Sequence, residues 1–317
     1  MDLKEEILDG LYVSEEFKQC AARVKMRRIA GRGVRLYVDE NDNRFVGATK
    51  CADLSMPKTA TKYLETWRNK MTAEWGSIEK VDEYVQNTAD YGTAVHVAIA
   101  NFFTFGKLDY LDFQGVFDEY FVKEARGRGV AQSVIDAAYY EAQKDLIGIL
   151  QFIEDYDVQP LSVEQMCKSL EIRTATPIDL PCRMNAKNYK ATAPEKRRRI
   201  TALLNIKTSK YKSGATHEFQ CAAEWICWQE SFGDSFPAHV VATIRPTAWK
   251  DTPKYDYHPY DISEHLIGQV KSAMKHNLKY CNILDVPSTK ILSEMWAFNV
   301  NEPIIDGYRM VNLIKEI

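Results

Sequence analysis

The stretch Thr201-Ala202-Leu203-Leu204-Asn205-Ile206-Lys207-Thr208-Ser209-Lys210 joins an apolar run to an abrupt series of small and polar residues. This pattern predicts a buried β-strand that ends at one edge of a sheet. Positions two apart in a strand share a face, so we expect the side chains of Asn205 and Lys207 to point into the same space. The rest of the chain is organised around this strand.

The composition is that of an ordinary globular protein. The 317 residues are 45% hydrophobic and 27% charged, enough for a large core. The net charge of -3 neither favours nor excludes a nucleic-acid partner, because a basic surface can be confined to one groove.

Seven widely spaced cysteines favour reduced thiols in the cytoplasm over a disulfide framework. They include no Cys-x-x-Cys, which disfavours a zinc or iron–sulfur site. The amino terminus lacks the order of charges of a signal peptide, and no apolar run approaches the ~20 residues that cross a bilayer. We therefore expect a soluble cytoplasmic protein without a membrane partner.

Apolar residues at helical spacing predict several long helices. One contains His96; a lone histidine on an apolar helix is more often a core residue than a ligand. Residues 104–130 are expected to be rich in loops, with aromatic side chains that pack or stack on bases. The first predicted helix spans residues 59–67, and the second starts near Ser77 and runs towards the segment 91–103. Further helices are predicted at 131–156, 216–232 and 262–280.

Short apolar runs predict the strands. The acidic turn at residues 39–43 favours a solvated β-turn over a calcium site, because it lacks the glycine and the distal glutamate of an EF-hand loop. A basic loop at residues 187–199 is either solvated or in contact with phosphates. The predicted strands are a hairpin at 34–38 and 44–46, then 161–167, 172–180, 201–207, 238–246 and a hairpin-like stretch near 255–260.

Polar groups lie within or directly beside these apolar runs. A buried carboxylate is costly unless it is paired or binds a cation, which singles out Asp179 in Pro177-Ile178-Asp179-Leu180. Carboxylates, a backbone carbonyl and water suit Mg²⁺ or Mn²⁺, and a nearby lysine can stabilise charge that develops on a phosphate. The ordered set is His96, Glu164, Asp179, Asn205, Lys207 and Gln220.

Four segments in this order resemble the PD-(D/E)XK nuclease superfamily, specifically its branch of RecB-like nucleases and phage recombination exonucleases. Gly92-Thr93-Ala94-Val95-His96 is similar to a Gly-Thr-x-x-His helix, and Thr176-Pro177-Ile178-Asp179-Leu180 to a Gly-Thr-x-Asp-Leu strand. Asn205-Ile206-Lys207-Thr208-Ser209 resembles Asp-x-Lys-Thr-Ser, and Phe219-Gln220-Cys221-Ala222-Ala223 a Gln-x-x-Ala helix. The resemblance covers about residues 45–245.

The resemblance implies a fold and a set of roles. The fold would be α/β (α+β), with a restriction-endonuclease-like core in which helices flank a central mixed sheet. The single domain, 1–317, would have its core at about 58–245, an N-terminal elaboration at 1–57 and a C-terminal extension at 246–317. Glu164 would be the upstream acid, with Glu171 as a competitor. The implied catalytic residues are Lys207, Asp179, Glu164 and Gln220, the metal ligands His96, Asp179, Asn205 and Ile206, and the substrate contacts Thr208, Ser209, Lys210 and Lys212.

The implied activity is metal-dependent hydrolysis of DNA, by an exonuclease of phage or bacterial recombination that uses Mg²⁺ or Mn²⁺. A recombination partner protein and a homo-oligomer are further expectations, and RNA remains open as a substrate. No helicase P-loop is present.

Asn205 departs from the pattern, because the family has an acid at this position. Three explanations stay open: metal binding through the other ligands, a DNA-binding or assembly subunit without cleavage, or an inactivating substitution.

Overall fold

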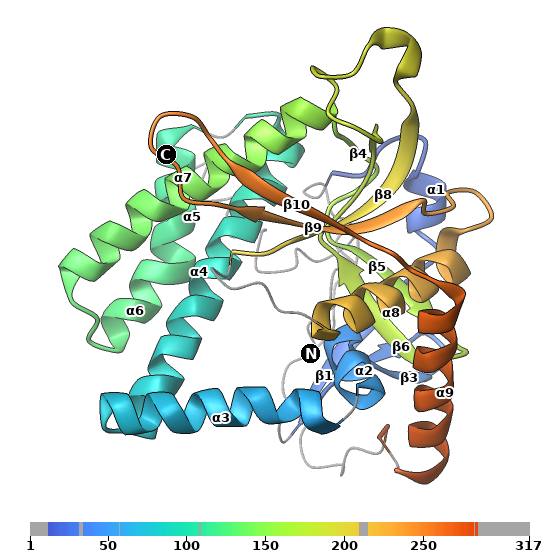
Figure 1. Ribbon diagram of the computed structural model, residues 1–317, viewed down its shortest axis with the longest axis horizontal. Coiled ribbons are helices and arrows are strands. Elements are labelled where there is room, and N and C mark those ends of the chain that lie inside the picture. Colours follow the sequence, from blue (N-terminus) through green and yellow to red (C-terminus); the bar gives the residue numbers. More distant parts are fainter. Residues whose placement is uncertain are drawn as a thin grey trace, which may run out of the picture.

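The chain folds into helices and two five-stranded mixed sheets (Figure 1). The structure is a computed structural model, and it describes residues 12–31, 34–56, 58–107, 109–208, 215–281 and 283–284. One sheet has the strand order β1-β2-β3-β6-β5 and the other β10-β9-β8-β7-β4. The predicted α/β (α+β) class is confirmed, but the strands of the described residues form two sheets where the sequence predicts one.

The first sheet begins with three antiparallel strands, β1 (Met26–Gly31), β2 (Val34–Asp39) and β3 (Arg44–Val46). β3 then pairs in parallel with β6 (Thr174–Ile178), which pairs antiparallel with β5 (Gln165–Ser169). The predicted hairpin at 34–46 is therefore confirmed as β2 and β3.

The acidic turn of this hairpin is held by hydrogen bonds. The Asp39 carboxylate accepts the main-chain N–H groups of Asn41 and Asn43 at 3.0 and 2.9 Å. It also accepts the Lys168 ammonium at 2.8 Å. Because protein donors surround the carboxylate, the interpretation as a β-turn holds and calcium is not required.

The second sheet carries the predicted strand that leads into Asn205 and Lys207, β8 (Arg199–Ile206). It pairs antiparallel with β7 (Leu180–Asn185) and in parallel with β9 (Val240–Pro246). The parallel connection is made by helix α8 (Ala215–Phe232), as a β-α-β crossover requires. β10 (Tyr255–Tyr260) and the short β4 (Gln159–Pro160) complete the sheet.

The two sheets are joined at Asp179, the single residue between β6 and β7. The prediction of one continuous strand over 172–180 is wrong at this point, because the backbone bends at Asp179. Glu164 likewise lies just before β5 and not inside a strand over 161–167. Both acids therefore lie on irregular backbone, where successive side chains need not point to alternate faces as they do in a strand.

Long helices surround the sheets. α4 (Ile78–Phe105) begins where predicted, with the Ser77 hydroxyl accepting the N–H of Lys80. None of the described helices combines the length and apolarity needed to cross a bilayer. Further helices are α1 (Lys18–Ala21), α2 (Ala48–Ser55), α3 (Lys58–Trp75), α7 (Gln132–Tyr156) and α9 (Glu264–Tyr280).

The expectation of a loop-rich segment at 104–130 is wrong. This segment contains α5 (Tyr110–Phe117), a π-helical turn (Asp118–Val122) and α6 (Lys123–Gly127). Phe113, Phe117 and Phe121 recur every fourth residue and are buried in a core shared with α4 and α7. These aromatic side chains pack in the interior, so they are not available for base stacking.

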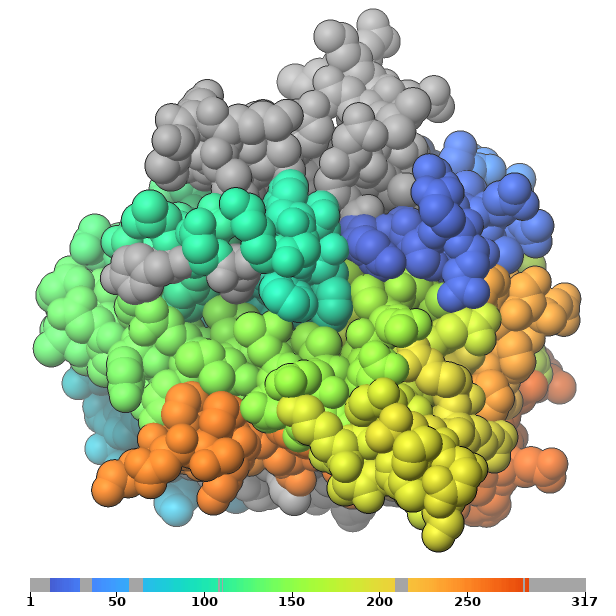
Figure 2. Space-filling view, turned by 90° about the horizontal axis from the view of Figure 1, so that it is seen from above, coloured from blue at the N-terminus to red at the C-terminus, as the bar shows by residue number. Residues whose placement is uncertain are grey.

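The basic loop joins β7 to β8 at the end of the hairpin opposite to Ile206. It forms a projecting lobe in yellow in Figure 2. Lys190 pairs with Glu154 at 3.0 Å, and the Arg197 guanidinium lies 3.7 Å from the centre of the Tyr189 ring. At about 3.3 Å per residue, the length of β8 separates this loop from the carboxyl end of the strand by roughly 20 Å.

Candidate functional site

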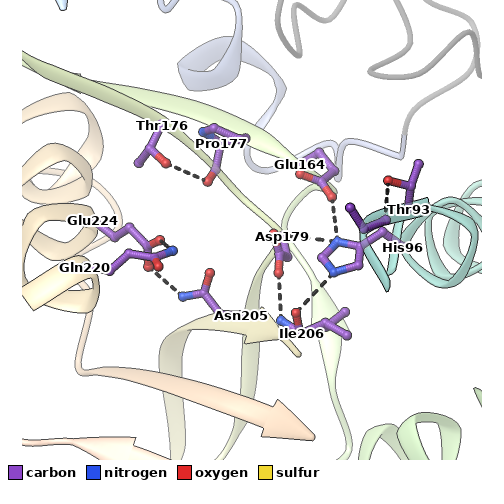
Figure 3. Close-up of polar contacts among 11 residues, drawn as sticks. Thr93, His96, Glu164, Thr176, Pro177, Asp179, Asn205, Ile206, Gln220 and Glu224 are labelled. Atoms are coloured by element: carbon purple, nitrogen blue, oxygen red, sulfur yellow. Dashed lines mark hydrogen bonds and ion pairs between the residues drawn. The ribbon is translucent and has the colours of Figure 1, made fainter. Parts of the chain in front are cut away.

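Three potential metal ligands converge from three separate parts of the chain (Figure 3). His96 projects from α4, Glu164 precedes β5, and Asp179 lies between β6 and β7. One ligand atom of each lies within 4.8 Å of the others. No other group of three histidine, cysteine or acidic side chains has this spacing within the described part of the chain.

Asp179 is positioned by main-chain hydrogen bonds on both sides. Its Oδ2 accepts the N–H of Ile206 at 2.7 Å, and its carbonyl oxygen accepts the N–H of Glu164 at 2.9 Å. These bonds link the end of β8 and the start of β5 to the bend at Asp179. The second carboxylate oxygen, Oδ1, lies 3.8 Å from Nδ1 of His96 and is the atom that faces the cluster.

Glu164 adopts a left-handed backbone conformation, with φ of 52°. This conformation costs a non-glycine residue roughly 1–2 kcal/mol, and strained backbone of this kind concentrates at functional sites. The side chain is almost fully buried. The competing acid, Glu171, is exposed and pairs with Lys271 at 2.7 Å, so Glu164 is the acid that joins the cluster.

His96 connects the acids to the end of β8. Its Nε2 lies 3.1 Å from the carbonyl oxygen of Ile206 and donates to it, which directs Nδ1 toward Glu164 Oε1 at 3.3 Å. Burial alone would lower the pKa of this imidazole, but the carboxylates of Asp179 and Glu164 raise it to about 9. In the metal-free protein a proton on Nδ1 therefore balances the two acids.

The donor set fits a divalent cation. Burial and the Asp179 carboxylate raise the pKa of Glu164. The two neighbouring acids can both be ionised only if a positive charge lies close to them. A cation at Nδ1 of His96 and at the carboxylates of Glu164 and Asp179 would supply this charge in place of the proton, and mixed oxygen and nitrogen ligands suit Mn²⁺ as well as Mg²⁺. Of the predicted ligands, His96 and Asp179 are brought together, while the Ile206 carbonyl accepts a hydrogen bond from His96.

Lys207 is the first residue after β8. Its main-chain N–H donates to the carbonyl of Ile244 at 2.9 Å, which continues the pairing of β8 with β9. Its ammonium is close enough to act electrostatically on His96, Glu164 and Glu224. The predicted catalytic lysine therefore lies beside the cluster.

Asn205 is buried and bonded to a residue that is not among those predicted from the sequence. Its Nδ2 donates to Glu224 Oε2 at 2.5 Å. The other oxygen of Glu224 accepts Nε2 of Gln220 at 2.7 Å. The predicted catalytic residue Gln220 thus contacts Glu224 and is not part of the group of His96, Glu164 and Asp179 (Figure 3).

Glu224 is 1% exposed and projects from α8. Burial raises the pKa of its carboxyl group to about 7, although Lys207, Gln220 and Asn205 act to lower it. A signal for this residue exists in the sequence, because Glu224 interrupts the apolar run from Cys221 to Trp228. The same reasoning that singles out Asp179 would have found it.

A second buried charge near Lys207 is also missing from the residues predicted from the sequence. Arg245 on β9 is 7% exposed, and its Nε has no hydrogen-bond partner among the described residues. Burial, with the charges of Lys207 and Arg245, lowers the pKa of His217 to about 4, so this imidazole is neutral near pH 7. Two cationic side chains therefore face one region at the end of β8.

Of the predicted substrate contacts, Thr208 lies against α4. A Cβ atom on Gly92 would be 3.2 Å from Thr208 Oγ1, so the glycine permits this close approach. Ser209, Lys210 and Lys212 lie outside the described residues.

Comparison of the chain with models of known protein families and with curated proteins gives no match. The functional assignment therefore rests on the geometry of the residues described above.

Proposed function

We propose that the protein is a metal-dependent nuclease that hydrolyses DNA phosphodiester bonds, an exonuclease of the RecB-like branch with a restriction-endonuclease-like core. It would act in DNA recombination or repair in the cytoplasm of a bacterium or of a phage-infected cell. The observation that carries the proposal is the convergence of His96, Glu164 and Asp179 within 4.8 Å, beside Lys207. These residues come from distant parts of the sequence, and Glu164 is buried while His96 and Asp179 are half-buried. Bringing two carboxylates together in such surroundings is costly unless a positive charge balances them.

The residues of this site suit phosphodiester hydrolysis. A bound Mg²⁺ or Mn²⁺ would polarise the scissile phosphate and stabilise the negative charge that develops on it. Glu164, Asp179 and His96 would hold the cation. Lys207 would orient the attacking water and stabilise the same charge, so that a P–O bond to water forms as the P–O bond to the leaving sugar oxygen breaks. That sugar oxygen takes up a proton as it leaves.

The test is digestion of linear and circular, single- and double-stranded DNA with Mg²⁺ or Mn²⁺ present or absent. We expect wild type to cleave only with metal, and Lys207→Ala to lose at least about a hundredfold in rate. Lys275→Ala, an exposed lysine on α9, is the matched control and should cleave like wild type. Equal cleavage by wild type and Lys207→Ala would refute the catalytic assignment. An RNA substrate in the same assay distinguishes the two nucleic acids.

Asn205 favours a second candidate, a DNA-binding or assembly subunit that retains the fold without cleavage, because a neutral amide replaces an acid. This candidate predicts metal-independent DNA binding and no cleavage by wild type under any metal. DNA binding that requires Mn²⁺, together with cleavage, would exclude it.

A further inference from the structure

The amide of Asn205 and the carboxylate of Glu224 form a buried pair at the end of β8. Asn205 is 2% exposed and Glu224 1%, and 2.5 Å separates Nδ2 from Oε2. Asn205 immediately precedes Ile206, whose N–H binds Asp179 and whose carbonyl accepts His96. The pair is therefore connected through Ile206 to two of the three proposed metal ligands, Asp179 and His96.

Glu224 is held as an acceptor on both sides. Oε2 accepts Asn205 and Oε1 accepts Gln220 at 2.7 Å. Within the described residues, no lysine or arginine lies within 4.0 Å of this carboxylate. A buried acid without a direct ion-pair partner is costly, so its position calls for an explanation other than fold stability.

The hydrogen bond fixes the orientation of the Asn205 side chain. Because Nδ2 donates to Glu224, the other terminal atom, Oδ1, is available as an acceptor (Figure 3). A hydrogen bond from an amide N–H to a carboxylate also increases the negative charge on the amide oxygen. Carboxylates in this outer position are known to orient ligands and raise their basicity toward a cation.

We propose that Asn205 and Glu224 act as one unit toward a divalent cation, in which Glu224 supplies through the Asn205 amide the negative charge that Asn205 lacks. Asn205 Oδ1 is the ligand atom, and Glu224 is a positioning residue that does not itself touch the cation. This inference rests on the proposed metal site.

The proposal reverses the simple expectation for Asn205→Asp. This change alone places two carboxylates at hydrogen-bond distance in a buried space, where one must be protonated. The double variant Asn205→Asp/Glu224→Gln instead exchanges the acid and the amide. The introduced glutamine would donate to the introduced aspartate and accept from Gln220, so the number of hydrogen bonds and the total charge are unchanged.

The experiment measures Mn²⁺ binding to the full chain by titration calorimetry, without nucleic acid, with circular dichroism as a check of folding. We expect Glu224→Gln to weaken Mn²⁺ binding about 10- to 100-fold. Asn205→Asp alone should not strengthen binding, and the double variant should return to within about threefold of wild type. Glu218→Gln, an exposed acid on the same helix, is the matched control and should bind like wild type.

A further pair of variants tests whether Glu224 acts through the amide. With Asn205→Ala as the starting point, the change Glu224→Gln should have no additional effect on Mn²⁺ affinity. The proposal would be overturned if Glu224→Gln bound Mn²⁺ with wild-type affinity. It would also be overturned if the effects of Asn205→Ala and Glu224→Gln on Mn²⁺ affinity simply added in the variant that carries both. Mn²⁺ binding is measured without DNA, so the two proposals can fail separately. If the effects of Asn205 and Glu224 on Mn²⁺ affinity are coupled but the protein cleaves no nucleic acid, the proposed nuclease activity is wrong and the proposed role of the pair is supported. If wild type cleaves DNA but the two effects on Mn²⁺ affinity are not coupled, the nuclease activity is supported and the proposed role of the pair is wrong.

Discussion

The main-chain N–H of Ile206 donates to the carboxylate of Asp179 at 2.7 Å, which links the last residue of β8 to the bend between β6 and β7. The same residue presents its carbonyl to His96, so one peptide segment positions an acid and an imidazole together. The bond has a structural role in addition to the proposed metal-binding role of Asp179, and substitutions can separate the two.

Asp179→Asn should abolish metal binding while keeping the hydrogen bond to Ile206. The asparagine Oδ1 can still accept the Ile206 N–H, while the charge that attracts a cation is lost. We expect the Mn²⁺-induced rise in melting temperature to disappear, and the melting temperature in EDTA to stay above that of Asp179→Ala. Asp179→Ala loses the hydrogen bond as well and should melt lower in EDTA. An undiminished response to Mn²⁺ in Asp179→Asn would show that this acid is not a ligand.

The stability of the metal-free protein should depend on the protonation of His96. The carboxylates of Asp179 and Glu164, acting against burial, raise the pKa of His96 from 6.5 to about 9. A raised folded-state pKa gives a contribution to stability that is fully present below pH 6.5 and is lost as the pH rises through about 9. The shift corresponds to about 3 kcal/mol.

Urea unfolding in EDTA between about pH 6 and pH 10 measures this contribution. Wild type should lose stability across that range, and His96→Gln should lose much less. His265→Gln, an exposed histidine on α9, should follow wild type. Parallel curves for wild type and His96→Gln would contradict a proton shared between His96 and the acids.

The sequence predicts which residues form the cluster better than it predicts the backbone conformation of those residues. Asp179 stands out because an acid between Ile178 and Leu180 is costly, and that cost is visible without a structure. Its bend is not visible, because a one-residue break leaves the apolar pattern on both sides intact. Glu164 shows the same limit, since nothing in its neighbours predicts a positive φ.

Glu224 and the segment at 104–130 illustrate two further limits. The partner of Glu224 is Asn205, and this contact depends on how α8 packs on β8, which local spacing does not determine. In the segment at 104–130, Phe113, Phe117 and Phe121 do carry a helical spacing. The π-helical turn at Asp118–Val122 does not interrupt this spacing, and nothing in the spacing predicts the turn.

Gly92→Ala should impair cleavage more than stability. The added Cβ would lie 3.2 Å from Thr208 Oγ1, so either α4 or the residue that follows Lys207 must move by a few tenths of an ångström. Positioning errors of this size reduce catalysis, and we expect a loss of about tenfold in cleavage rate. Thr208→Ala removes the contacting oxygen and should restore part of the rate to Gly92→Ala.

The control is Gly115→Ala, because this helical glycine has nothing within 4 Å of the added Cβ. It should retain the wild-type rate and gain up to about 1 kcal/mol from the better helix propensity of alanine. Equal rates for Gly92→Ala and Gly115→Ala would show that the approach of Thr208 to α4 has no catalytic consequence.

Arg245 should contribute to nucleic-acid binding. It follows Ile244 on β9 as Lys207 follows Ile206 on β8, and Ile244 and Ile206 are register partners, so both cations lie on one face of the sheet. A buried guanidinium whose Nε lacks a partner among the described residues is a fixed positive charge that a phosphate can satisfy. Arg245→Met retains much of the apolar stem and removes this charge.

We expect Arg245→Met to weaken binding of a labelled DNA oligonucleotide about tenfold at low salt, as measured by fluorescence anisotropy with Ca²⁺ in place of Mg²⁺. The slope of log affinity against log salt concentration should fall by about 0.9 if one phosphate contact is lost. Arg23→Met, at an exposed position beyond α1, provides the comparison and should change neither quantity. A lower melting temperature with unchanged affinity and slope would assign Arg245 a structural role instead, since a phosphate contact must appear in the salt dependence.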